Sequence, residues 1–220
     1  MKVCTDACLF GAWVAEIIVN AQLPVKRILD IGSGTGLLSL MLAQKSTASI
    51  DAIEIDEAAA EQAQENFKQS KYKSRLHLIH TDIRTYNVDE VYDLVISNPP
   101  FFDNHLKSEH KQRNIALHSQ LLNYTELISA AKAALKPGGV FAILLPFSRS
   151  AAFIAMAATH NLLLNQHLAL QQTERHPPFR SIMLFSLQHR KTVNSTLTIK
   201  EEGEYTLNFT TLLKDYYLFL

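Results

Sequence analysis

The stretch Leu29-Asp30-Ile31-Gly32-Ser33-Gly34-Thr35-Gly36 decides the fold, because it reads as a β-strand that runs into a glycine-rich turn and then into a helix. Glycine adopts positive φ easily and lets the backbone approach a ligand closely. A dinucleotide-binding turn requires G-x-G-x-x-G, but the third glycine position in that register is Leu37, and Gly36 lies one residue early. The turn therefore lacks the pattern that binds a pyrophosphate.

Short β-type runs alternate with helical stretches along the chain, which is the pattern of a βαβ sheet. The predicted strands are Arg27–Ile31, Ile50–Ile55, Leu76–His80, Asp93–Ser97, Val140–Leu145, Leu164–Leu170 and Ser181–Leu187. The predicted helices are Leu37–Gln44, Glu57–Gln69 and Tyr124–Leu135. Several strands are continuous runs of Ile, Leu and Val, as expected when helices cover both faces of a sheet. The sequence therefore predicts one α/β domain over residues 1–220, with a seven-stranded sheet.

Charge and cysteine content limit the kinds of protein this can be. Lys and Arg number 21 and Asp and Glu also number 21, so the formal net charge is zero. Indiscriminate nucleic-acid binding, which needs many phosphate contacts from Lys and Arg, is disfavoured. The two cysteines, Cys4 and Cys8, have no histidine cluster or second pair nearby, so we expect no metal and no disulfide framework. No run approaches the ~20 apolar residues of a membrane span, and we expect a cytoplasmic protein.

Two carboxylates follow predicted strands at the edge where the glycine turn lies. Glu54 lies near the end of the second strand, 22 residues after Gly32, where a carboxylate can accept both ribose hydroxyl protons of an adenosine cofactor. Asp56 is the competing residue, although its place before Glu57 suits a helix N-cap better. Asp82 follows the third strand and is the candidate acceptor for the cofactor's adenine amine; the alternative is a solvated turn residue.

The fourth strand ends in Asn98-Pro99-Pro100-Phe101, whose chemistry suits methylation of a flat amine. An amine on a purine is a poor nucleophile because its lone pair is delocalised into the ring. The Asn98 side-chain oxygen and the Pro99 carbonyl can each accept one N–H, which directs the lone pair toward a methyl donor. Pro100 stiffens the turn, and Phe101 offers a face for an extruded base, worth ~1–3 kcal/mol of stacking. The sequence predicts catalytic roles for Asn98, Pro99 and Phe101, and the alternative is a rigid strand exit.

The glycine turn resembles motif I of class I methyltransferases, which cradles the amino-acid part of S-adenosylmethionine. Asn-Pro-Pro-Phe or Asn-Pro-Pro-Tyr occurs in adenine-N6 methyltransferases, but also in release-factor glutamine and ribosomal guanine-N2 enzymes. Both chain ends narrow the choice: residues 2–13, KVCTDACLFGAW, and residues 217–220, YLFL, resemble the opening and closing residues of the bacterial tRNA(Val) adenine-N6 methyltransferase family. The resemblance extends over essentially the whole chain.

Membership of that family implies a Rossmann-like fold whose last strand is antiparallel, S-adenosylmethionine as methyl donor, and N6 of the adenine 3′ of the anticodon, adenosine-37, as acceptor. It also implies a donor pocket formed by Thr5, Asp6, Gly11, Gly32, Gly34, Gly36, Glu54, Asp82 and Asn98. Residues 1–26 would be an amino-terminal segment of this site, and residues 101–120 a loop facing the substrate. We expect a monomer with tRNA as partner.

RNA contacts are predicted from basic residues near the site. The candidates are Lys107, Lys111, Arg113 and Arg180. After the catalytic loop, the pattern of the family resembles Arg-x-x-Ala-Arg. This chain has Leu117 at the second basic position of that pattern, and His118 only partly replaces the missing basic residue. Phe141, Phe147, Phe185 and the aromatic cluster at residues 216–219 are predicted to be core or a closing flap.

Two other functions stay open from the sequence. The first is methylation of another planar amine or amide, in ribosomal RNA or in a release-factor glutamine. Release-factor enzymes carry a helical domain before the first strand, and only about 26 residues precede that strand here. The second is a non-catalytic donor-binding module that interacts with RNA, for which Asn98 would be dispensable.

Overall fold

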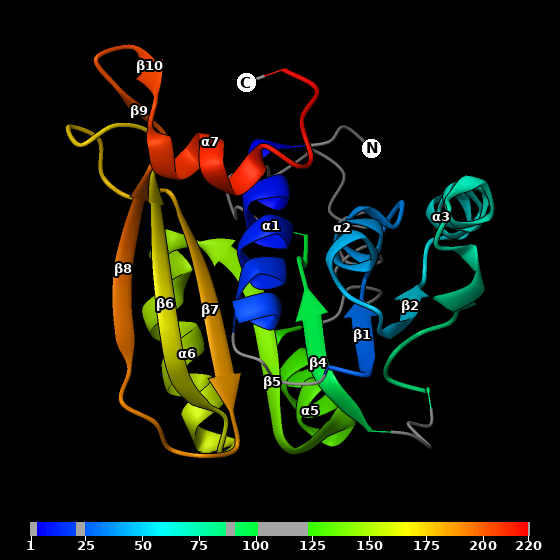
Figure 1. The fold of residues 1–220 in the computed structure, drawn as a ribbon. Helices are drawn as coiled ribbons and strands as arrows, with labels where there is room; N and C mark the ends of the chain where they lie inside the picture. Colours follow the sequence, from blue (N-terminus) through cyan, green and yellow to red (C-terminus); the bar gives the residue numbers. More distant parts are fainter. Residues whose placement is uncertain (1–3, 21–24, 87–90, 101–122, 220) are drawn as a thin grey trace, which may run out of the picture.

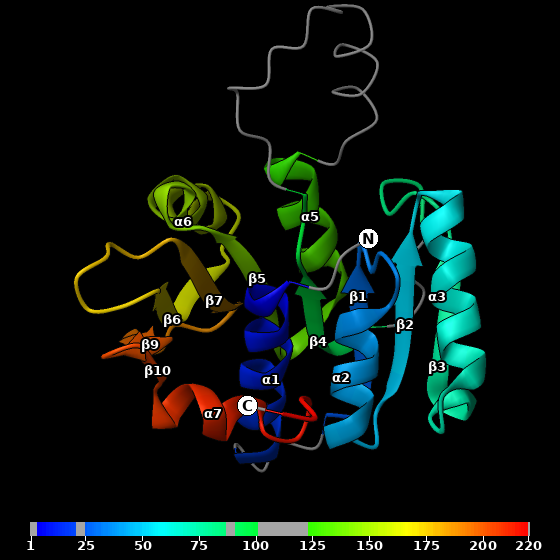
Figure 2. The ribbon, with the colours of Figure 1, turned by 90° about the horizontal axis from the view of Figure 1, so that it is seen from above.

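A computed structural model describes residues 4–20, 25–86, 91–100 and 123–219. It shows a twisted sheet between two layers of helices, which confirms the predicted α/β fold (Figures 1 and 2). The helices of the described ranges are α1 (Thr5–Asn20), α2 (Leu37–Lys45), α3 (Glu57–Gln69), α5 (Tyr124–Ala134), α6 (Ser150–Thr159) and α7 (Leu207–Leu213), with 3-10 turns η1 (Lys73–Arg75) and η2 (Phe147–Arg149). None of the described helices is long and apolar enough to cross a bilayer.

The main sheet places its strands in the order β3-β2-β1-β4-β5-β7-β6-β8 within the described residues. The strands are β1 (Arg27–Ile31), β2 (Ser49–Glu54), β3 (Leu76–His80), β4 (Tyr92–Ser97), β5 (Leu135–Pro146), β6 (Leu163–Gln171), β7 (Arg180–Ser186) and β8 (Val193–Thr198). β1 is parallel to both β2 and β4, so the strand order reverses between β1 and β4. Ligands of open α/β sheets bind outside the carboxyl ends of the strands at such a point.

β7 is antiparallel to both of its neighbours, β5 and β6. The antiparallel strand expected near residues 181–187 is therefore confirmed. Its direction brings the start of β7 to the edge where β5 ends, because Arg180 pairs with Pro146. Residues from the second half of the chain thus reach the edge at which the glycine turn lies.

The prediction of seven strands was wrong by one. β8 is an additional edge strand that pairs in parallel with β6, and its first four residues are exposed. Its sequence, VNSTLT, has neither a continuous apolar run nor a buried face along its whole length, so the usual sequence signal of a strand is weak. A short hairpin follows, in which two strands of two residues each, β9 (Lys200–Glu201) and β10 (Glu204–Tyr205), pair antiparallel. The sequence did not predict this hairpin either.

Local capping explains where two helices begin. The Asp56 carboxylate accepts the Ala59 N–H at 2.8 Å and caps α3, which confirms the N-cap alternative for this residue. Asn123 and Glu126 form a reciprocal capping box at the start of α5. Both signals are local in sequence, which is why these helix starts were predictable.

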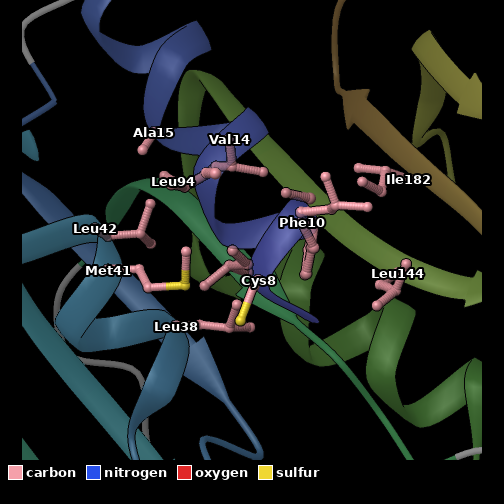
Figure 3. Close-up of a cluster of buried hydrophobic side chains, with 14 of the residues drawn as sticks. Cys8, Phe10, Val14, Ala15, Leu38, Met41, Leu42, Leu94, Leu144 and Ile182 are labelled. Atoms are coloured by element: carbon pink, nitrogen blue, oxygen red, sulfur yellow. The ribbon is translucent and has the colours of Figure 1, made fainter. Parts of the chain in front are cut away.

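Two hydrophobic cores hold the helices on the sheet. One core joins α1, α2, α3 and α7 to one face, and the other joins α5 and α6 to the opposite face. Figure 3 shows Phe10 and Val14 of α1 among Leu38, Met41 and Leu42 of α2 and side chains from the strands. The amino-terminal segment is therefore a buried helix lying beside the glycine turn's helix, α2.

Candidate active site

The turn between β1 and α2 is held by the neighbouring strand. Gly32, Gly34 and Gly36 have φ values of +72°, +56° and +83°, in the left-handed region that favours glycine. The N–H groups of Gly32 and Ser33 donate to the Ile53 carbonyl at 2.8 and 3.0 Å. The turn is thereby fixed to the carboxyl end of β2.

Gly32 and Gly36 serve different purposes. A Cβ at Gly32 would meet no atom within 4 Å, so this part of the turn borders open space that a ligand can occupy. A Cβ at Gly36 would lie 2.4 Å from Cε1 of Phe67 in α3. Gly32 is therefore exposed to a ligand, whereas Gly36 permits helix packing.

Gly36→Ala is expected to lower the free energy of unfolding by about 3 kcal/mol or more, because the left-handed conformation costs ~1–2 kcal/mol and the new Cβ also clashes with Phe67. Chemical denaturation measures this. Gly203→Ala is the matched control, since Gly203 also has positive φ, +93°, but no atom within 4 Å of a Cβ. Equal losses for the two variants would show that the Phe67 contact contributes nothing.

Glu54 supports the turn through its carboxylate. One oxygen accepts the Gly34 N–H at 2.7 Å, and the other accepts the N–H groups of Ile55 and Asp56, both at 2.9 Å. The side chain is buried. Since a carboxylate has about four acceptor positions, three of them are already used by the backbone. Glu54 lies where the sequence placed it, but its contacts in this structure are with the turn itself.

Asp30 is buried beneath the turn and has an unusual environment for a carboxyl group. One oxygen accepts the Ser39 hydroxyl at 2.7 Å, and the other has no hydrogen-bond partner. Burial, offset in part by the Ser39 hydrogen bond and reinforced by the charge of Glu54, raises the pKa of Asp30 to about 7.

The raised pKa of Asp30 predicts that the contribution of this carboxyl group to stability falls as pH rises from 5 to 7. In this window the folded state holds a proton on Asp30 that the unfolded state has lost, so the free energy of unfolding decreases by about 1.4 kcal/mol per pH unit. The lowered pKa of His167 acts in the opposite direction below pH 6.5, so the Asp30 contribution is read as the difference between wild type and Asp30→Asn. Urea unfolding at several pH values measures the slope. Asp30→Asn should remove this contribution, while Asp93→Asn, a change at the opposite sheet edge, should leave it in place; an equal slope in wild type and Asp30→Asn contradicts the assignment.

Asn98 lies just beyond β4, beside the turn. The Ser97 hydroxyl donates to the Ile31 carbonyl at 2.8 Å, which ties the end of β4 to the end of β1. The Asn98 side-chain oxygen is buried and has no hydrogen-bond partner, and Pro99 is buried while Pro100 is exposed. A buried acceptor without a donor costs about 1–3 kcal/mol, and a ligand that donates a hydrogen bond to Asn98 would remove this cost.

Asp82 lies in the turn after β3 and is occupied by a neighbouring side chain. Its two oxygens accept the Arg84 guanidinium at 2.5–3.0 Å, and one also accepts the Arg84 N–H. These hydrogen bonds from Arg84 lower the pKa of Asp82. The Asp82 carboxylate is at the predicted edge, but a cofactor amine would have to share it with Arg84.

The predicted residues of α1 are divided between the site edge and the core. Asp6 accepts the Arg180 guanidinium at 2.8 Å, an ion pair that joins α1 to β7, and Thr5 is exposed beside it in sequence. Gly11 is buried, and a Cβ there would lie 2.7 Å from the Met41 sulfur. Gly11 therefore allows α1 and α2 to approach closely, and Arg180 links two elements of the fold.

Four predicted site residues lie outside the described residues: Phe101, Lys107, Lys111 and Arg113. The whole substrate-facing loop predicted at residues 101–120 lies outside them as well. Among the described residues no group of three or more His, Cys, Asp or Glu side chains is arranged to hold a metal ion.

Sequence reasoning missed two residues that shape this site. Asp30 was part of the quoted motif, and its position inside an apolar strand was a signal that its carboxyl group is buried. Ser97 connects β4 to β1, but a serine before Asn98 carries no such signal in the sequence. The pairing of β1 with β4 is needed to see it.

The reversal of strand order at β1 and β4, with an antiparallel strand beside β5, defines the class I methyltransferase fold. A predicted O-methyltransferase from Agrobacterium tumefaciens has this fold, with a TM-score of 0.73 over 95% of each chain at 18% identity. A glycopeptide N-methyltransferase solved with S-adenosylmethionine has a TM-score of 0.60 over 81% of this chain and 94% of its own, at 11% identity.

The chain belongs to the family of tRNA1(Val) (adenine(37)-N6)-methyltransferases. Residues 14–159 match the methyltransferase small domain family. The relative from Dyadobacter fermentans is 42% identical over 99% of this chain and 91% of its own length. The relatives from Pseudoalteromonas translucida and Pectobacterium carotovorum are 39% and 40% identical, over 99% and 100% of this chain and 92% and 88% of their own. All three carry the same family name.

Proposed function

We propose that this protein transfers a methyl group from S-adenosylmethionine to the N6 amine of adenine 37 in a valine tRNA, as a cytoplasmic tRNA-modifying enzyme. The observation that carries the proposal is the buried Asn98 oxygen without a donor, at the point where the strand order reverses. The family names of the relatives, which share about 40% of their residues with this chain, support the choice of substrate.

The residues at the turn fit S-adenosylmethionine. Open space at the Cβ position of Gly32 leaves room for a ligand against the backbone, and the buried Ser33 hydroxyl has no hydrogen-bond partner. We propose that Gly32, Gly34 and Gly36 shape the pocket for the amino-acid part of the donor, with Glu54 and Asp82 beside its adenosine part. Thr5, Asp6 and Gly11 stay predictions from the resemblance.

When bound, S-adenosylmethionine supplies a methyl group on a positively charged sulfur, which makes that carbon open to attack by a nitrogen lone pair. The Asn98 oxygen accepts one N–H of the adenine amine, and the Pro99 carbonyl accepts the other. These two acceptors hold the amine so that its lone pair points into the pocket, which removes much of the entropic cost of alignment. The proton that leaves the nitrogen passes to solvent.

Incubation of the purified protein with isotopically labelled S-adenosylmethionine and unmodified tRNA tests the proposal. Nuclease digestion followed by mass spectrometry should find N6-methyladenosine immediately 3′ of the anticodon. Label found only in a protein acceptor or in ribosomal RNA would favour the release-factor or ribosomal alternative. Donor binding without any transfer to RNA would favour the non-catalytic one.

A further inference from the structure

Two phenylalanines are partly exposed at the sheet edge next to Asn98. Phe147 follows β5 directly and is 38% exposed, and Phe179 immediately precedes β7 and is 37% exposed. Phe141 and Phe185 are fully buried, as predicted, whereas Phe147, which was predicted to belong to the core or to a closing flap, does not belong to the core. We call Phe147, Phe179 and His167, which packs against the first of them, the aromatic patch.

The ring of Phe147 is supported from behind by an ordered set of side chains. It stacks on the His167 ring at 6.0 Å between centroids and 18° between planes. His167 Nε2 lies 2.8 Å from the Ser181 hydroxyl, which in turn lies 2.6 Å from the Ser150 hydroxyl. Both serines are buried. Burial lowers the pKa of His167, so this supporting ring is neutral at neutral pH.

The backbone and an arginine fix the rest of the aromatic patch. The Phe147 N–H donates to the Phe179 carbonyl at 3.1 Å, and the Phe179 N–H donates to the Leu170 carbonyl at 2.9 Å. The Arg180 guanidinium lies 5.7 Å from the Phe179 ring centre and is itself held by Asp6. Among the described residues these contacts hold the two partly exposed phenylalanine rings in place.

The aromatic patch lies at the same edge as Asn98. β5 pairs with β4, with Ile143 opposite Ser97, and β7 pairs with β5, with Arg180 opposite Pro146 (Figure 1). Neighbouring strands are about 5 Å apart, and β5 continues three residues beyond Ile143 to Pro146, about 10 Å along the strand, so the aromatic patch begins roughly 11 Å from the end of β4. This separation suits a nucleotide beside the one whose base reaches Asn98.

We propose that the aromatic patch is a stacking surface for a nucleobase that flanks the target adenine in the single-stranded loop of the RNA. The proposal rests on the proposed function, since it assigns the neighbour of the methylated base. An enzyme that extrudes a base must replace the stacking which the neighbouring bases lose, and aromatic faces do so for any base. Sequence-specific RNA recognition uses unstacked loop bases in this manner.

The charges around the aromatic patch favour RNA as its occupant. Arg149 follows Phe147 within η2 and is exposed, and Arg175 is exposed in the connection that leads to β7. Two acidic residues lie close to these arginines among the described residues. Glu174 precedes Arg175 in the sequence, and Asp6 is already paired with Arg180. Arginines beside exposed rings can bind the phosphates of a nucleotide that stacks there.

The test uses anticodon stem-loop RNA in which 2-aminopurine, whose fluorescence is quenched by stacking, replaces the nucleotide on either side of the target. Wild type and Phe147→Trp should quench the probe at one of these positions. Phe147→Leu, which keeps apolar volume but has no ring, should not, and should raise both the Kd and the KM for RNA about tenfold or more. Donor affinity should stay within twofold. An RNA affinity of Phe147→Leu equal to wild type overturns the proposal.

A control and a second variant make every outcome decisive. Tyr205→Leu is the control, because Tyr205 is 46% exposed and stacks on Phe209 at 4.6 Å but belongs to the separate β9–β10 hairpin. Phe179→Leu substitutes for Phe147→Leu if that variant loses donor binding or folds poorly. Methylation by wild type with an unchanged KM in both leucine variants overturns only the aromatic patch. RNA binding that depends on Phe147 without any methylation overturns only the proposed function.

Discussion

Asn98→Ala is expected to lower kcat for RNA methylation by at least about 10²-fold, the loss typical of removing one preorganised polar contact to a reacting group. The reason is that no other side-chain oxygen of the described residues is buried and unpaired at the end of β4. RNA affinity should change little, because Asn98 acts on the alignment of the amine, whereas a change in donor affinity would report the donor-pocket contact that the family resemblance implies for this residue. Single-turnover kinetics with saturating donor and RNA separate these quantities.

Two further variants distinguish alignment from folding. Asn98→Asp keeps an acceptor oxygen and should retain more activity than Asn98→Ala. Asn165→Ala is the matched control, because Asn165 is also a buried asparagine with an unpaired side-chain oxygen, but it lies on β6 and donates to Ser186 at 2.7 Å. It should lower stability and leave kcat near that of wild type. Equal losses of kcat in Asn98→Ala and Asn165→Ala would show that Asn98 has only a structural role.

Glu54→Gln is expected to weaken S-adenosylmethionine binding at least about tenfold and to lower the free energy of unfolding by about 1–3 kcal/mol. The carboxylate accepts three backbone N–H groups, one of them from Gly34 in the turn. A glutamine has a single acceptor oxygen, so its NH₂ group would face an N–H donor and the turn would lose its shape. Calorimetry measures donor binding, and urea unfolding measures stability.

Asp56→Ala provides the comparison for Glu54. This residue caps α3 through the Ala59 N–H, so its loss should cost about 1 kcal/mol of stability and leave donor affinity within twofold. Unchanged donor binding in Glu54→Gln would contradict the role assigned to this carboxylate. A stability loss shared by both variants, with a binding loss only in Glu54→Gln, is the result that the geometry predicts.

Local patterns explain why most of the fold was predictable. β1 and β3 have the bounds that the sequence predicted, because both are short runs rich in Ile and Leu between helical stretches or turns. β8 was missed because an edge strand buries little and shows no apolar run. α1, α6 and α7 were missed as well. α6 follows β5 after only the three residues of η2, without a side-chain cap to mark its start.

The site was predictable in position but not in its side-chain contacts. The glycine turn and Asn98 both follow strands, and parallel strands bring their carboxyl ends to one edge, which pattern reasoning captures. The ion pair between Asp6 and Arg180 joins residues 174 positions apart, and the Arg84 contacts of Asp82 depend on side-chain rotamers. The exposure of Phe147 depends on how β7 and β6 pack around it. These contacts are set by tertiary structure.

The most direct measurement is a crystal structure of the protein with a non-transferring donor analogue and the unmodified anticodon stem-loop. The account predicts that the Asn98 side-chain oxygen and the Pro99 carbonyl each lie within about 3.2 Å of the adenine N6 atom. The same atom should face the donor's sulfur position above the glycine turn. A complex in which the target adenine occupies the pocket while the Asn98 oxygen binds another group would contradict it.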